Sequence, residues 1–142
     1  MKLKIGEKEY TLEYTFEAVA NEDCVRKTIE LLTNLEDEGK ELAERISIVP
    51  STVISLFYGG LIENHEEEVQ DEQVARKLLK QYIKENKDDD NATFYGIMLQ
   101  IIEQMGEDGF LAQIGLGAKS PKKQPKTPQD RKKKAITKKI EV

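Results

Sequence analysis

Few residues in this sequence have side chains suited to chemistry at neutral pH. His65 is the only histidine and Cys24 the only cysteine. A catalytic nucleophile needs a base beside it, and a zinc site needs several cysteine or histidine ligands. We therefore expect His65 to lie in a solvated acidic loop and Cys24 to be a buried or half-buried, unreactive thiol. The sequence predicts no catalytic residue and no enzymatic activity.

The acidic and glycine-containing segments do not match the spacing of a metal or phosphate site. A calcium loop needs glycine at its sixth position, but a loop beginning at Asp88 has Thr93 there and one beginning at Asp89 has Phe94. We interpret the Asp88–Asp90 run as an acidic first turn that suits a helix dipole. Neither Gly59-Gly60 nor Gly115-Leu116-Gly117 fits a phosphate-binding loop. The sequence therefore predicts neither a metal nor a cofactor.

Charge is divided unequally along the chain. Residues 1–117 contain 25 acidic and 12 basic residues, a net charge of −13, whereas residues 118–142 contain 2 acidic and 10 basic residues, a net charge of +8. The basic segment has three prolines and no helical periodicity. We expect a globular domain at residues 1–117 and a disordered basic tail at residues 118–142.

The N-terminal residues alternate between apolar and polar side chains as a hairpin would. Gly6 suits the turn, and one strand face would carry Tyr10, Leu12, Tyr14 and Phe16. We expect this face to pack on the helices. No signal peptide follows Met1, and no stretch approaches the roughly 20 apolar residues of a membrane span.

Helical periodicity replaces alternation after Phe16. Val25, Ile29 and Leu32 indicate one helix, and Leu42 and Ile46 indicate a short one. Ser51, Asp71 and Asn91 are expected N-caps of three more. For the helix after Asp71 we expect Val74, Leu78 and Tyr82 to face inward. The predicted fold class is α+β, mainly α: an N-terminal hairpin, about four or five helices and the disordered tail.

The helix beginning near Ser51 has apolar residues on more than one side. We expect one side to serve the core and another to bind a neighbouring chain. The candidate partner-binding residues are Val53, Ile54, Phe57, Tyr58, Leu61 and Ile62.

The order of these segments resembles a known family. KLKIGEKEYTLEYTFEAV is a hairpin that leads into a helix, VPSTVISLFYGGLIEN is a helix with an aromatic-Gly-Gly-Leu ending, and VARKLLKQYIKE follows an acidic loop. Over roughly residues 1–105 this order resembles the tail assembly chaperones of long-tailed phages of Gram-positive bacteria. The positions that match the family's helix ending are Leu56, Phe57, Tyr58, Gly60 and Leu61.

The resemblance implies a binding protein without catalytic residues. Such a protein would keep the tape measure protein soluble, help recruit tail tube protein, self-associate, act in the host cytoplasm and be absent from the mature virion. The basic tail departs from the family pattern. The alternative is a small cytoplasmic regulator that binds nucleic acid through this tail. Because the tail lacks aromatic residues and the body is acidic, we do not expect nucleic-acid binding.

Overall fold

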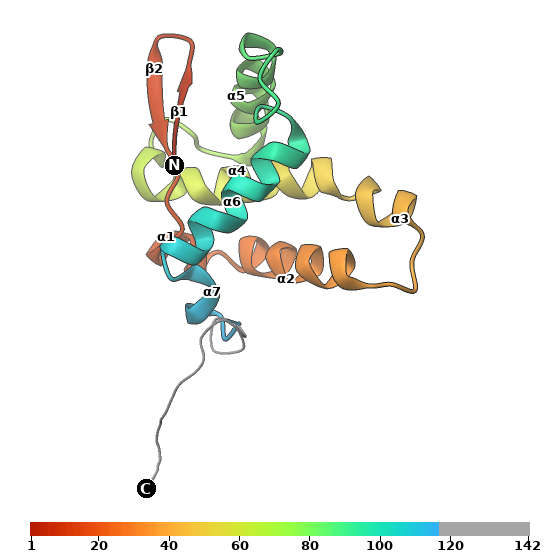
Figure 1. The fold of residues 1–142 in the computed structure, drawn as a ribbon. Helices are drawn as coiled ribbons and strands as arrows, with labels where there is room; N and C mark the ends of the chain where they lie inside the picture. The colour runs from red at the N-terminus through yellow and green to blue at the C-terminus, as the bar shows by residue number, and fades with distance from the viewer. Residues whose placement is uncertain (117–142) are drawn as a thin grey trace, which may run out of the picture.

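The computed structural model describes residues 1–116 and consists mainly of helices (Figure 1). The N-terminal hairpin contains β1 (Lys2–Ile5) and β2 (Lys8–Thr11), which pair antiparallel with Lys2 opposite Thr11. The helices are α1 (Phe16–Ala20), α2 (Glu22–Glu36), α3 (Leu42–Ser47), α4 (Val49–His65), α5 (Glu72–Glu85), α6 (Phe94–Glu107) and α7 (Phe110–Gln113). The predicted fold class is confirmed. The predicted disordered tail, residues 118–142, lies outside the described residues.

The hairpin turn follows from Gly6. Its φ of 65° lies in the left-handed region, which glycine adopts without a steric penalty. Leu3 and Ile5 of β1 are buried, whereas Lys2 and Lys4, which alternate with them, are exposed. β1 therefore uses one face to pack on α5, and the Gly6 amide donates a hydrogen bond to Glu85 Oε1 at the end of that helix (2.9 Å).

The second strand ends earlier than the alternation predicts. The Glu13 amide donates to the carbonyl oxygen of Gly60 (2.9 Å), and the Tyr14 amide donates to Asp108 Oδ2 (2.9 Å). These bonds draw the chain from the sheet onto the helices. Leu12 and Tyr14 are buried as expected, but Phe16 begins α1 and is 74% exposed. The prediction that Phe16 packs in the core is therefore wrong.

Helix α4 lies at the centre of the molecule. It contacts β2, α1, α2, α3, α5 and α6; Figure 1 shows α2 running beside it and α6 crossing it. A helix that is apolar on all sides is normally buried on all sides. By length and composition the helical stretch Leu42–His65 would also be apolar enough to cross a membrane, contrary to our expectation. Because 56% of its most apolar window is buried inside the protein, this is weak evidence for a membrane span.

Glycines allow two close approaches to α4. A Cβ atom on Gly59 would lie 2.6 Å from the Cys24 sulfur, and one on Gly60 would lie 2.5 Å from Tyr14 Cζ. Gly59-Gly60 does not end the helix, which continues to His65. The Tyr14 hydroxyl donates to the carbonyl oxygen of Leu56 (2.8 Å). This bond and the close approach to Gly60 hold the buried ring against α4.

The expected helix caps are correct at one of three positions. Asp71 caps α5 by accepting a hydrogen bond from the Val74 amide (3.1 Å). Ser51 is not a cap, because α4 begins at Val49 and Pro50 occupies its first turn, where the missing amide hydrogen costs nothing. Asn91 is not a cap either, because the hydroxyl of Thr93 accepts from the Gly96 amide (3.0 Å) and α6 starts at Phe94.

The buried faces of α2 and α5 do not coincide with the apolar stripes of their sequences. Cys24, Thr28 and Leu31 are the inward residues of α2, whereas Ile29 is 40% exposed. On α5, Tyr82 is buried as predicted, but the other inward residues are Ala75 and Leu79, whereas the predicted Val74 and Leu78 are half-buried. In both helices the more strongly apolar stripe does not face the core directly, so apolar side chains remain at the surface of α2.

Candidate partner-binding site

The predicted partner-binding residues of α4 belong mostly to the core. Val53, Phe57 and Leu61 have no exposed surface, and Ile54 is 8% exposed. Tyr58 and Ile62 are half-buried. The side of α4 that we expected to face a neighbour is instead covered by the chain's own helices and hairpin. Of the six residues, Tyr58 and Ile62 alone are accessible to a partner.

The larger apolar surface lies on α1 and the outer side of α2. Three surface depressions adjoin there: the first and second share Val19, and the second and third share Ile29 and Glu30. We call this continuous surface the α1–α2 groove. Its apolar lining residues are Phe16, Val19, Ala20, Val25, Ile29 and Ile48.

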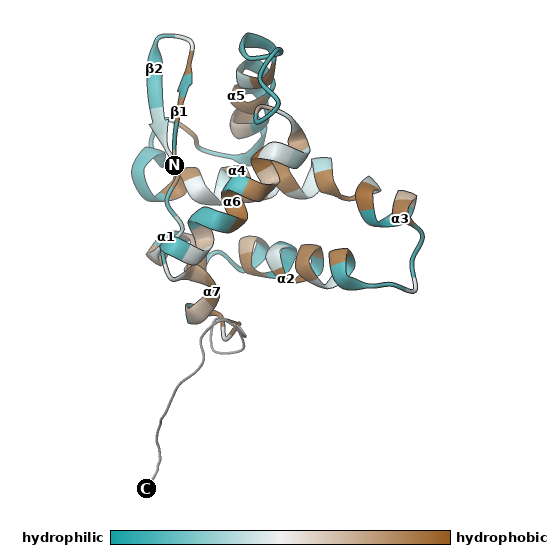
Figure 2. Ribbon diagram, in the orientation of Figure 1, coloured by the Kyte–Doolittle hydropathy of each residue, from teal (hydrophilic) through white to brown (hydrophobic). Residues whose placement is uncertain are grey.

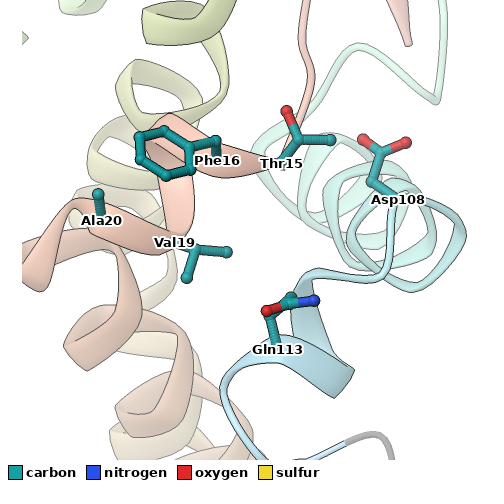
Figure 3. Close-up of a pocket in the computed structure, with 6 residues that line it drawn as sticks. All are labelled: Thr15, Phe16, Val19, Ala20, Asp108 and Gln113. Atoms are coloured by element: carbon teal, nitrogen blue, oxygen red, sulfur yellow. The ribbon is translucent and has the colours of Figure 1, made fainter.

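The first depression opens between α1 and the C-terminal helices (Figure 3). Phe16, Val19 and Ala20 lie on the α1 side, and Asp108 and Gln113 lie opposite them, at the end of α6 and on α7. Asp108 is held in place because its Oδ2 accepts from the Tyr14 amide and its Oδ1 accepts from Gln104 Nε2 (2.9 Å each). The same carboxylate therefore supports the core and borders the groove.

The border of the α1–α2 groove is acidic. Two of the charged residues that line it are basic, Arg26 and Lys40. Arg26 forms ion pairs with Asp23 and with Glu30, the latter at 3.1 Å, and Lys40 donates to Asn34 Oδ1 (2.8 Å). The acidic lining residues are Glu22, Glu30, Asp37 and Asp108. An apolar floor with an acidic border fits a segment that has apolar and basic side chains.

The other exposed large apolar residues do not line the α1–α2 groove. Leu42 and Ile46 are on α3, and Tyr95 and Leu99 are one turn apart on α6. Figure 2 shows that α3 and α2 each carry apolar residues between polar ones. Tyr95 and Leu99 do not line any part of the α1–α2 groove, which makes them a suitable comparison surface.

Cys24 is a buried thiol, as the sequence predicts. It is 2% exposed, and burial, followed by the nearby Asp23 carboxylate, raises the pKa of the thiol to about 12. A thiol with so high a pKa carries almost no thiolate at neutral pH. Packing against Gly59 gives this residue a structural role.

The acidic runs do not assemble a metal site within residues 1–116, where no group of three or more potential ligands is close enough together to hold an ion. Asp88, Asp89 and Asp90 are exposed and precede α6 rather than forming its first turn. Asp89 Oδ1 accepts a hydrogen bond from the Asn91 amide (2.9 Å), so this carboxylate stabilises the local turn.

His65 is the residue whose position the sequence pattern predicts least well. It ends α4, its side chain is 11% exposed, and the expectation of a solvated loop is wrong. Its Nε2 accepts a hydrogen bond from the Thr11 amide (3.0 Å), and its Nδ1 lies 2.8 Å from Glu68 Oε1. Because Nε2 accepts, the imidazole is neutral with its proton on Nδ1. His65 thus joins β2 to the end of α4.

A pH dependence follows from this bond. Burial, and secondly the charge of Lys8, lower the pKa of His65. The Glu68 carboxylate contacts both Lys8 and the His65 ring. The unfolded chain therefore binds a proton at His65 at higher pH than the folded protein does. The free energy of unfolding is unaffected above the unfolded pKa of about 6.5 and declines as pH falls towards the lower folded value.

We expect the urea concentration at which half of the wild type is unfolded to decrease as the pH is lowered from about 7.5 to about 5.5. Histidine is the side chain that ordinarily titrates in this range. In a His65→Gln variant, whose amide oxygen can still accept from the Thr11 amide, that fall should be largely removed. Equal pH slopes in the two proteins would contradict this account of His65.

Comparisons with protein-family models, with curated proteins and with solved structures found no match to this chain.

Proposed function

We propose that this chain is a tail assembly chaperone of a long-tailed phage or prophage, and a binding protein rather than an enzyme. In this role it keeps the tape measure protein soluble in the host cytoplasm, helps recruit tail tube protein and is absent from the mature virion. It also self-associates. The family resemblance of residues 1–105 suggests the role, and the α1–α2 groove is the observation that best supports it.

The groove has the properties that such a role needs. A long amphipathic helical chain exposes apolar stripes until they are covered, and each Å² buried contributes about 25 cal/mol. No element within residues 1–116 covers Phe16 or Ile29, which are 74% and 40% exposed. A helix of the tape measure protein with an apolar stripe would bind there in the helix-in-groove manner. The acidic body would keep the complex dispersed.

Co-expression tests this proposal. The full chain, carrying an affinity tag, is produced together with a tape measure protein encoded beside it, and the soluble, co-purifying fraction is measured. We expect the wild type to solubilise and retain the partner. We expect Phe16→Asp with Ile29→Asp to lose retention at least about tenfold, which corresponds to roughly 1.4 kcal/mol of binding free energy.

The matched control replaces Tyr95 and Leu99 of α6 with aspartate and should retain the partner. If the wild type neither retains nor solubilises it, the proposed function is wrong. If the groove variant and the α6 variant both retain the partner, the function stands and its assignment to the groove is wrong.

A further inference from the structure

We infer that the α1–α2 groove binds the basic C-terminal segment of this same chain, residues 131–142. This inference goes beyond the proposed function and holds whichever partner the groove serves. It rests on three features: where the described chain ends, the charge of the groove border, and the composition of the segment.

The described chain ends beside the groove. α7 contacts α1, and Gln113 of α7 lines the first depression together with Phe16 and Val19. The chain leaves the described structure three residues later, at Leu116. The 20 residues from there to Ile136 span at most roughly 72 Å when extended. Helix α2 has 15 residues and is therefore about 22 Å long, so the segment is long enough to reach along it.

The composition of the segment complements the groove. Residues 131–142 contain six basic residues and one acidic residue, and they hold the three large aliphatic side chains of the basic tail, Ile136, Ile140 and Val142. The basic side chains match the acidic border, while the aliphatic ones match the apolar floor. Arg26 and Glu30 of the border are paired with each other, so their charges largely offset. The border then has Glu22, Asp37 and Asp108 against Lys40, which leaves it acidic.

Attachment to the chain makes a weak contact sufficient. Two sites joined within one chain meet at an effective concentration on the order of millimolar. A contact too weak to detect between separate molecules is therefore populated within one. The electrostatic part of the contact is screened as the Debye length falls from about 10 Å at 0.1 M salt to about 3 Å at 1 M salt.

The test compares backbone amide NMR spectra of full-length proteins. In one variant Ile136, Ile140 and Val142 are replaced by serine; in the matched control Ala135 and Thr137 are replaced by serine. We expect the aliphatic variant, but not the control, to shift the amide signals of groove residues such as Phe16, Val19 and Ile29. The signals of Tyr95 and Leu99 should not move. Raising salt from about 0.1 M to about 1 M should move the wild-type groove signals in the same direction as the aliphatic variant.

A groove substitution completes the test. In full-length Ile29→Asp the three serine substitutions should cause no further shift at Phe16 or Val19. Unchanged groove signals in the aliphatic variant would overturn the inference, as would equal changes at Tyr95 and Leu99. It would also be overturned if the groove shifts depend on protein concentration and sedimentation shows a dimer, because a second copy would then occupy the groove.

Discussion

Replacing Gly60 with alanine should lower the free energy of unfolding by about 1–3 kcal/mol, the usual cost of overpacking a core. The new methyl group would lie 2.5 Å from Tyr14 Cζ and 2.6 Å from the Tyr14 hydroxyl oxygen. Tyr14 cannot easily move away, because it has no exposed surface and its hydroxyl donates to the carbonyl oxygen of Leu56. Chemical denaturation of the two proteins measures the difference.

Gly106 provides the matched control for this substitution. It also lies within a helix, but a Cβ atom there would meet nothing within 4 Å. Gly106→Ala should therefore stabilise the protein by up to about 1 kcal/mol through helix propensity alone. In a double-mutant cycle, Gly60→Ala should cost less in a Tyr14→Leu background, because the colliding ring atoms are absent. Equal effects at Gly60 and Gly106 would contradict the close approach.

The largest stability effect is expected at Phe57. Truncating this fully buried side chain at the centre of α4 should cost about 3–5 kcal/mol, since the transfer free energy is lost and a cavity remains. For a protein of this size that is a large part of the total stability. The measurement is the urea or thermal unfolding of Phe57→Ala.

Phe16→Ala is the comparison for Phe57→Ala, with the same atoms removed from an exposed site. We expect a change within about 0.5 kcal/mol, as for other surface positions. The difference between the two stability changes thus distinguishes a phenylalanine of the core from one on the groove surface. A large loss of stability in Phe16→Ala would contradict its placement at the surface and restore the original prediction from strand alternation.

Local chemistry was sufficient to predict several elements of this fold. Gly6 places the hairpin turn because positive φ is a property of that residue. Asp71 caps α5 through a bond to an amide three residues ahead. The division between an acidic body and a basic tail is likewise a matter of composition.

The tertiary structure decided which apolar residues are buried. Phe16 continues the alternation of the second strand, yet the Glu13 and Tyr14 amides bond to α4 and to Asp108, so the strand ends before it. The second apolar side of α4 is covered by other helices, and the exposed apolar surface lies on α1 and α2 instead. His65 is held by an amide 54 residues away in the chain. Periodicity shows which residues share a face of a helix or strand, but which face is covered depends on contacts between segments that are distant in the sequence.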